Sequence, residues 1–326
     1  MQPAQALSAQ GGQTSNLQTE KPVNGGFVKY IGIEKKKAMW GWIFTSPALL
    51  LFLLFSLYPM LDAFRNTFFS VRLLSLRKPQ FVGIQNYIQV LKSASFFASM
   101  KATAIFTLEA FIPLTIFSMV FGLIITTRKK GQRVLQLLVY APAVFSSVVA
   151  ALIWLLLFDP RGLANATVNF LMATPGVDHR WLTAPSMLQI STAAIYFWKH
   201  IGYFSIIFVT GIAKIPQSTL EAAEIDGASA FQTVRSIIIP LLRPTTVMVS
   251  IVAMLNCLKS FSTQYLFAQR GAPLAPINVV TLSIYNTAIR DLNISRACVM
   301  SIILFFVMMA MTVVRLQSSE KDKVNY

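Results

Sequence analysis

The chain has 326 residues, of which 55% are hydrophobic and only 12% are charged, and its mean hydropathy is +0.60. Soluble domains usually contain roughly 25% charged residues, so this composition excludes an ordinary soluble protein and predicts a membrane-embedded one. The net charge of +16 does not indicate nucleic-acid binding, because the basic residues are spread over tails and loops beside apolar segments, where they attract membrane lipid.

The chain divides into four parts by composition. Residues 1–38 form a polar tail whose start is rich in Gln, Ser, Gly and Ala and is predicted to be disordered. The apolar run that follows is too long for a signal peptide, so we expect it to stay attached as a membrane span. The predicted parts are this cytoplasmic tail, a first span with its outer loop at 39–97, a core at 98–316 with a polar loop at 214–244, and a cytoplasmic tail at 317–326.

Six apolar segments follow one another, each long enough for a bilayer crossing, which needs about 20 residues. They run over 40–61, 98–127, 134–158, 187–212, 237–267 and 297–316. A lipid-facing backbone has no water to satisfy its polar groups, so each span is predicted to be helical, and several are long enough to tilt or kink. The predicted fold class is therefore all-α, a polytopic membrane protein with six transmembrane helices.

The placement of basic residues predicts the orientation of these spans. With the first tail in the cytoplasm, fifteen Lys and Arg residues fall on the cytoplasmic side and eleven on the outer side, while Lys199 and Lys259 fall within spans. The bias is small but has the sign of the positive-inside rule. We therefore expect both termini and the polar loop at 214–244 to be cytoplasmic.

The polar loop between the fourth and fifth spans is predicted to form a helix, a sharp turn and a second helix. Ser218 and Glu221 have the spacing of a capping box, so a short helix should start near Ser218. Gly227 should end it, because glycine adopts a left-handed turn most easily. Ser229 and Gln232 repeat the capping-box spacing and should open the second helix.

No catalytic or metal-binding constellation is found in the sequence, which favours a non-catalytic protein. An integral-membrane enzyme would need titratable residues gathered at one depth. The chain has no P-loop, so a transporter driven by ATP would take its nucleotide-binding domains from another chain. The isolated candidates are two histidines, two cysteines within apolar runs and two loop carboxylates, which have no plausible catalytic partners and are expected to be solvated: His179, His200, Cys257, Cys298, Asp159 and Asp178.

The polar loop resembles the cytoplasmic EAA loop of ABC importer permeases. The residues that match the pattern are Glu221, Ala222, Ala223, Asp226, Gly227, Ala228 and Pro240. In that family the loop forms the coupling helix, which sits in a groove of the ATPase and transmits its closure. The same string also fits a capped helical hairpin that merely links two spans.

Further segments resemble the carbohydrate-uptake branch of this family, the permeases of the maltose and glycerol-phosphate type. They are 81–87 (FVGIQNY), 151–165 (ALIWLLLFDPRGLAN) and 213–216 (AKIP). The resemblance implies a subunit of a bacterial inner-membrane sugar importer that binds no cofactor itself. Its implied partners are a second, different permease chain, two ATP-binding cassette subunits that hold ATP and magnesium, and an extracytoplasmic solute-binding protein.

Polar residues within the spans are the candidates for a translocation pathway, because a charge in the bilayer usually faces a cavity or the bundle interior. Aromatic residues near them are candidates for stacking on a pyranose ring. The candidates are Glu109, Lys199, Tyr203, Asn256, Lys259, Phe261, Gln264 and Tyr265. Their presence also fits lysines that snorkel to an interface, a glutamate paired between helices, and aromatics of the core or the membrane belt.

Two functional alternatives stay open at this point. Within ABC import, the substrate is a sugar or oligosaccharide, or alternatively a polyol, glycerol phosphate or acidic saccharide. From another class, the chain is a secondary transporter or channel that works without an ATPase. A membrane-anchored scaffold would leave the charges within the spans unexplained.

Overall fold

The computed structural model describes residues 25–75, 78–128 and 130–321, and the chain divides into two units, Met1–Leu61 and Asp62–Tyr326. Most of the predicted first tail, Lys129 and the last five residues of the predicted second tail lie outside the described residues. The side chains of 25–35 and 319–321 lie outside them as well.

The first unit is one long apolar helical stretch. It contains α1 (Gly25–Phe52), a single π-helical turn η1 (Leu53–Leu57) and the first residues of α2 (Tyr58–Asn66). The stretch Lys36–Asn66 is long and apolar enough to cross a membrane, which agrees with the first predicted span. Residues 25–38, assigned to the polar tail by composition, already lie in α1, because no proline separates them from the apolar run and 34–38 (EKKKA) are good helix formers.

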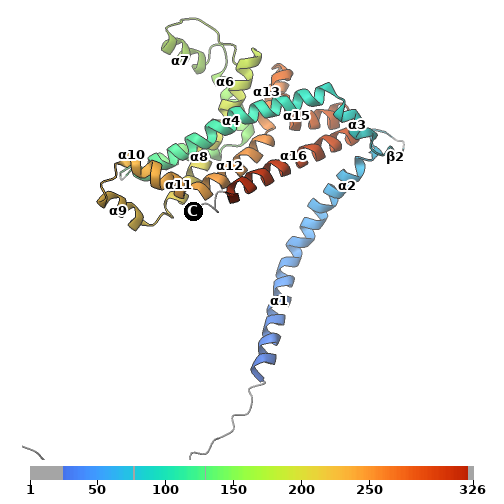
Figure 1. Ribbon diagram of the computed structural model, residues 1–326. Helices are drawn as coiled ribbons and strands as arrows, with labels where there is room; N and C mark the ends of the chain where they lie inside the picture. Colours follow the sequence, from blue (N-terminus) through green and yellow to red (C-terminus); the bar gives the residue numbers. More distant parts are fainter. Residues whose placement is uncertain (1–24, 76–77, 129, 322–326) are drawn as a thin grey trace, which may run out of the picture. The chain divides into compact units, whose positions relative to one another are not determined.

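The second unit is built on four helices that run side by side (Figure 1). They are α4 (Ala94–Thr127), α8 (Pro185–Ile212), α12 (Arg243–Leu258) and α16 (Ile294–Lys321). The main core lies between α4, α8 and α12, where Phe106, Phe204 and Val249 are almost completely buried. Helices α9 and α10 lie at one end of this bundle, and α3 lies at the opposite end (Figure 1).

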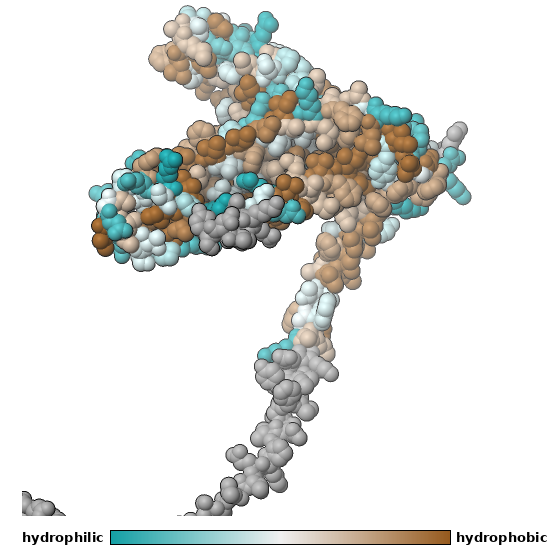
Figure 2. Space-filling view, viewed as in Figure 1, coloured by the Kyte–Doolittle hydropathy of each residue, from teal (hydrophilic) through white to brown (hydrophobic). Residues whose placement is uncertain are grey.

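Helix α4 shows how the sequence separates a lipid-facing side from a packed side. Exposed apolar residues recur every fourth position, and the buried side consists mainly of small and hydroxylated residues. The exposed residues are Leu108, Ile112, Ile116, Val120 and Ile124, and the buried ones include Ser99, Thr103, Ala110, Ser118 and Gly122. In Figure 2 the flank of the second unit is largely hydrophobic, as expected for a surface in contact with lipid tails.

Three glycines allow close approach between helices. A Cβ on Gly202 of α8 would lie 2.7 Å from the Cα atom of Tyr140 in α5 (Gln132–Val144). A Cβ on Gly122 would lie 2.7 Å from the Cβ atom of Phe208, and one on Gly211 would lie 2.7 Å from Thr245 Oγ1. Membrane helices associate through such small residues, because lipid provides no hydrophobic driving force between them.

The third predicted span, 134–158, is not one straight helix. It consists of α5 and α6 (Ser147–Leu157), which meet at an angle of 98°. Phe145 is extended at the break, and the Ser146 side chain caps α6 by accepting from the Val149 amide at 3.2 Å. The described residues therefore contain five helices able to cross a membrane, or six if this bent pair is counted as one span.

The fifth predicted span, 237–267, is also interrupted and starts later than expected. A proline-containing elbow at Leu242 precedes α12, and the chain then breaks at 259–261 before α13 (Ser262–Gln269). Phe261 is non-helical, with φ −146° and ψ −51°, and Thr281 Oγ1 donates to the Ser260 carbonyl. The Thr281 hydroxyl thus satisfies the Ser260 carbonyl, which has no helical partner at the break.

Short helices complete the second unit: α14 (Leu274–Ile277), α15 (Val280–Tyr285), the π-helical turn η3 (Asn286–Arg290) and α7 (Leu163–Met172). Buried Asn165 of α7 organises the loop between α6 and α8. Its amide donates to the Pro160 carbonyl at 3.0 Å and to Asp178 Oδ1 at 3.1 Å, and its oxygen accepts from Trp181 Nε1 at 2.8 Å. These contacts give a structural role to the Asn at the end of 151–165.

The two loop carboxylates are exposed, as the sequence predicts, and each also accepts a hydrogen bond from the backbone amide two residues later. Asp159 Oδ1 accepts from the Arg161 amide at 3.0 Å. Asp178 Oδ1 accepts from the Arg180 amide at 3.0 Å and from Asn165, and these hydrogen bonds hold the pKa of the Asp178 carboxyl below its ordinary value. The partners are backbone amides and an asparagine brought close by the turn, which spacing alone does not reveal.

A small sheet, not expected in an all-α chain, joins the end of α2 to the next helix. Strands β1 (Phe69–Ser70) and β2 (Gln80–Phe81) pair antiparallel, with Phe69 opposite Phe81. The pairing of these strands is only two residues long, too short to leave an alternating hydrophobic signal.

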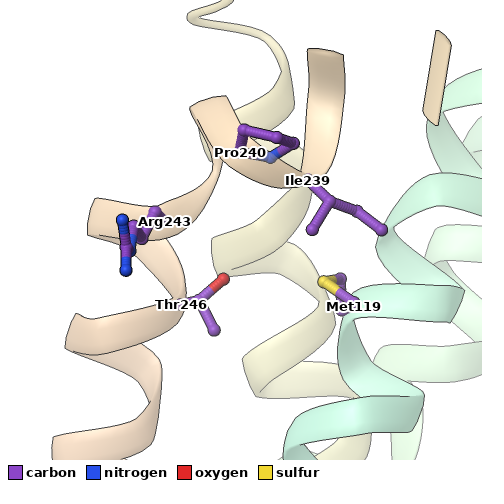
Figure 3. Close-up of a pocket in the computed structure, with 5 residues that line it drawn as sticks. All are labelled: Met119, Ile239, Pro240, Arg243 and Thr246. Atoms are coloured by element: carbon purple, nitrogen blue, oxygen red, sulfur yellow. The ribbon is translucent and has the colours of Figure 1, made fainter. Parts of the chain in front are cut away.

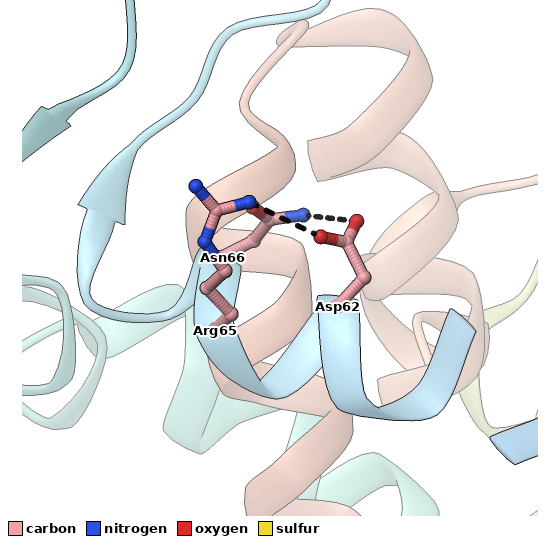
Figure 4. Close-up of polar contacts among 3 residues, drawn as sticks. All are labelled: Asp62, Arg65 and Asn66. Atoms are coloured by element: carbon pink, nitrogen blue, oxygen red, sulfur yellow. Dashed lines mark hydrogen bonds and ion pairs between the residues drawn. The ribbon is translucent and has the colours of Figure 1, made fainter. Parts of the chain in front are cut away.

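Polar contacts are present at the end of α2, just before the sheet. Asp62 contacts the Arg65 guanidinium at 3.6 Å and accepts from Asn66 Nδ2 at 3.0 Å (Figure 4).

Asn86, from the segment 81–87, holds this sheet against α3 (Gln85–Leu91). Its buried side-chain amide donates to the Thr67 carbonyl at 2.8 Å and to the Phe69 carbonyl at 3.0 Å. Tyr87 adds a hydrogen bond from its hydroxyl to Thr67 Oγ1 at 3.0 Å. Asn86 and Tyr87 of the segment 81–87 therefore have a structural role.

We expect Asn86→Ala to destabilise the second unit by about 1–3 kcal/mol, because the buried Thr67 carbonyl loses its side-chain donor and the half-buried Phe69 carbonyl loses one of its donors. The measurement is the thermal unfolding midpoint of the purified protein in detergent. Gln85→Ala is the matched control, since Gln85 is the exposed neighbour in the same helix. Equal midpoints for the two variants would show that the Asn86 hydrogen bonds do not hold the sheet.

Candidate functional site

The polar loop at 214–244 folds into the predicted helix, turn and helix. They are α9 (Gln217–Ile225) and α10 (Ala230–Thr233), and a π-helical turn η2 (Val234–Ile238) and α11 (Ile239–Leu241) continue α10. The loop lies at one end of the bundle, near the last turns of α16 (Figure 1). We call residues 217–241 the coupling loop.

Backbone geometry explains the turn between α9 and α10. Gly227 has φ +76°, and the Ala228 amide donates back to the Ala223 carbonyl at 2.9 Å while the Gly227 amide donates to the Glu224 carbonyl at 3.1 Å. This is the hydrogen-bond pattern of a Schellman motif, as the glycine predicted. The Ser229 capping box is present too, with the Ser229 amide donating to Gln232 Oε1 at 2.8 Å.

The capping box predicted at Ser218 and Glu221 does not form. Helix α9 begins one residue earlier, with Pro216 at its N-cap and no side-chain cap. The proline ring fixes the φ angle at this position, so the helix starts here without a side-chain cap. Glu221 therefore lies in the second turn, exposed, where its carboxylate is available to another molecule.

The surface of the coupling loop combines acidic and apolar side chains. Glu221, Ala222 and Asp226 are exposed, whereas Ala223 is buried and Ala228 half-buried. Ile225 and Phe231 are 85% and 71% exposed at the tip of the loop. A tip of this kind is typical of a surface that docks into another protein.

Pro240 lies at the base of the coupling loop beside a cavity of about 410 Å³. Figure 3 shows Ile239, Pro240 and Arg243 at the elbow where α11 leads into α12, with Met119 facing them from α4 and Thr246 below. The exposed proline is part of the joint that connects the coupling loop to the fifth span. A displacement of the loop would thus act directly on α12.

A second cavity, of about 330 Å³, gathers four of the predicted pathway residues: Lys199, Asn256, Lys259 and Phe261. It lies where both interrupted spans break, beside the middle of α8. Its other lining residues are Ser147, Ile195, Tyr196, His200, Ser260, Ser262 and Thr263. We call it the polar pocket.

Aromatic rings line one side of the polar pocket and lie behind it. Phe261 stacks on Tyr265 with ring centroids 5.1 Å apart, and both rings contact Tyr285. His200 donates from Nδ1 to the Tyr196 carbonyl at 2.8 Å, and its ring stacks on Tyr196 at 4.0 Å. These contacts hold the aromatic wall in place.

The other predicted pathway residues lie elsewhere. Gln264 is fully buried behind the break and accepts from Ser260 Oγ at 3.1 Å. Glu109 lines a separate, mainly apolar cavity of about 530 Å³ between α4 and α8. Tyr203 is partly exposed on α8 and contacts Phe204. The roles of all three in a pathway stay predictions.

The sequence did not assign to the pathway seven residues that line the polar pocket: Ser147, Ile195, Tyr196, His200, Ser260, Ser262 and Thr263. His200 stands alone as a possible metal ligand, so the sequence gives it no site. The serines lie at helix breaks, and the signal available for them was a cluster of hydroxyl residues inside an apolar run, as in 260–263.

Comparison with known proteins places the chain among transport-system permeases. Residues 117–318 match the sequence profile of the family described as binding-protein-dependent transport system inner membrane component. A trehalose/maltose transport system permease of Thermococcus litoralis is 28% identical over 87% of this chain and 95% of its own length. An sn-glycerol-3-phosphate transport system permease of Agrobacterium fabrum is 27% identical over 87% and 96%.

Solved structures show the same fold. A chain of a bacterial alginate ABC transporter, crystallised with an alginate-bound periplasmic protein, superposes with a TM-score of 0.74 over 90% of this chain and 97% of that one, at 18% identity. The profile match covers more than half of the chain and includes α8, the coupling loop, the polar pocket and most of α16. The chain therefore belongs to the family of binding-protein-dependent transport system inner membrane components.

Proposed function

We propose that the chain forms half of the translocation pathway of an ATP-driven importer for a sugar or oligosaccharide. Membership of the family makes it a non-catalytic permease that works with a binding protein in the inner membrane. The observation that carries the ATP-driven part is the coupling loop, which projects from the end of the bundle with an exposed apolar tip.

In this proposal the coupling loop docks into an ATPase subunit that binds ATP and magnesium. Glu221, Ala222 and Asp226 present polar and small surface, while Gly227 sets the angle between α9 and α10. Pro240 and the elbow connect that movement to α12, one wall of the polar pocket. The closure of an ATPase pair would thereby shift the pathway between inward and outward access.

The complex would contain a second permease chain, two ATPase subunits and an extracytoplasmic solute-binding protein, embedded in membrane lipid. The sugar class rests on relatives whose names refer to trehalose and maltose, to starch degradation products and to glycerol phosphate. The hydroxyls, amide and aromatic ring of the polar pocket suit a polyhydroxylated ligand. Family membership disfavours a secondary transporter, a channel or a scaffold.

A labelling experiment tests the orientation that this function needs. In a variant with Cys257 and Cys298 replaced by Ala, a cysteine at Ser229 should react with an impermeant thiol reagent only after the membrane is opened. A cysteine at Phe170, exposed in the loop between α6 and α8, should react in intact cells. Reaction at Ser229 from outside would place the coupling loop away from any cytoplasmic ATPase.

A further inference from the structure

Two lysines of the polar pocket lie within predicted membrane spans. Lys199 is near the midpoint of the 28-residue α8, roughly 20 Å from either end at the rise of an α-helix. Lys259 lies inside the 27-residue stretch Arg243–Gln269. Snorkelling, which places a charge at the interface when it lies near a helix end, does not account for Lys199.

No acidic side chain compensates these two charges among the described residues. The residues that line the polar pocket include two ammonium groups and no Asp or Glu. Neither lysine forms an ion pair in the described part of the chain. Glu109, the acidic residue within α4, lines the separate apolar cavity with Ala193 and Phe197, on another side of α8.

The backbone adds further positive potential at the same place. Ser147, the first residue of α6, and Ser262 and Thr263, the first two of α13, line the pocket. The positive ends of two helix dipoles therefore lie beside the two ammonium groups. Interrupted membrane helices with their N-termini at a cavity are suited to anionic groups of a substrate.

The remaining lining residues suit the uncharged part of a ligand. Asn256 and Ser260 supply an amide and a hydroxyl, and Phe261 supplies a ring that is fixed by its stacking on Tyr265. A neutral sugar would use these groups but would leave the partly buried Lys199 and the exposed Lys259 without a counter-charge. A ligand that carries a negative charge would satisfy both sets of groups.

We propose that the substrate of this permease carries an anionic group, a carboxylate or a phosphate, which Lys199 and Lys259 bind together within the polar pocket. The inference rests on the proposed import function and narrows its substrate class. Asn256, Ser260 and Phe261 then orient the hydroxylated part of the substrate. The two lysines determine specificity, because a neutral analogue leaves their charges unpaired.

The test compares matched probes on the purified complex of both permease chains with the ATPase. Glucuronate and glucose differ by a carboxylate, and glycerol phosphate and glycerol differ by a phosphate. Binding is measured from the concentration dependence of the thermal midpoint, at constant ionic strength. We expect the anionic member of at least one pair to bind about tenfold tighter or more, as for a charge-assisted contact, and that pair identifies the anion.

Substitutions test whether the two lysines cause the tighter binding of the anionic probe. Lys199→Gln and Lys259→Gln should each remove most of this preference for the anion, whereas Lys199→Arg and Lys259→Arg should retain it. Lys214→Gln, at an exposed lysine beside the coupling loop, should leave the preference unchanged. Equal binding of charged and neutral probes, or a preference that survives both Gln variants, would overturn the inference.

The same preparations distinguish a failure of this inference from a failure of the proposed function. A complex that retains its ATPase but shows no preference for either anion overturns the anionic substrate and leaves the importer proposal standing. A second result would also overturn the anionic substrate: Lys199→Gln and Lys259→Gln lower the thermal midpoint although the unchanged complex binds no anion. That result would indicate that the lysines pair with acidic residues of the second permease chain. A chain that purifies without an ATPase counts against both proposals.

Discussion

Replacing the apolar tip of the coupling loop by a carboxylate should abolish uptake while leaving the protein in the membrane. Ile225→Asp and Phe231→Asp change side chains that are 85% and 71% exposed, so the fold loses almost no buried surface. Large apolar residues at the centre of an interface commonly contribute at least about 2 kcal/mol to binding, which corresponds to roughly a 30-fold loss of affinity. We expect uptake of the transported sugar to fall by at least that factor.

Two further variants test the same docking surface by other means. Glu221→Lys reverses an exposed charge in the second turn of α9, and Gly227→Asp places a Cβ at φ +76°. No atom lies within 4 Å of the position that a Cβ on Gly227 would occupy, so the expected effect comes from backbone strain of about 1 kcal/mol or more. Both variants should insert at near-normal abundance and transport poorly.

The measurements are membrane abundance, sugar uptake and co-purification of the ATPase. Phe170→Asp is matched to Phe231→Asp in chemistry and exposure but lies in α7, and it should retain the ATPase. Loss of co-purification in the coupling-loop variants would indicate failed docking, and its retention with failed uptake would indicate failed coupling. Normal uptake in all four variants would refute the role of the loop.

Gly202→Ala should destabilise the bundle although alanine is the better helix former. The added Cβ would lie 2.7 Å from the Cα atom of Tyr140 and from the carbonyl carbon of Val139. Both are backbone atoms, so relief requires a shift of α5 as a whole. Overpacking of this kind costs about 1–3 kcal/mol, which exceeds the gain of roughly 1 kcal/mol expected from replacing a helical glycine by alanine.

The shift of α5 should reach the polar pocket as well. Phe145, at the break between α5 and α6, stacks near Trp198 with ring centroids 6.5 Å apart, and Ser147 directly beyond it lines the pocket. We therefore expect reduced uptake together with a lower thermal midpoint.

Gly41→Ala is the matched control for this change. Gly41 is also helical, and no atom lies within 4 Å of the position that an added Cβ would occupy, so the midpoint should stay equal or rise. Equal effects of the two substitutions would show that close approach at Gly202 does not stabilise the bundle.

Elements whose signals are local could be predicted from the sequence. Long apolar runs indicated the spans, because every backbone group in lipid must be satisfied within a helix. Gly227 and the Ser229–Gln232 pair predicted the turn and the second helix of the coupling loop, because both depend on residues a few positions apart. Helix α9 starts near Ser218 as predicted, but the capping box expected there does not form, because Pro216 is at the N-cap.

Only the tertiary structure shows which polar residues lie together. The break at 145–146 leaves no mark in hydropathy, because a bent span has the same composition as a continuous one. The polar run at 259–264 (KSFSTQ) lowers the hydropathy of the fifth span but does not show that the helix is interrupted there. Those breaks bring Ser147 of α6 and Ser262 of α13 to Lys199 of α8, whereas Glu109 faces a different cavity. The grouping depends on the rotation and crossing of packed helices, which is a property of contacts between distant segments.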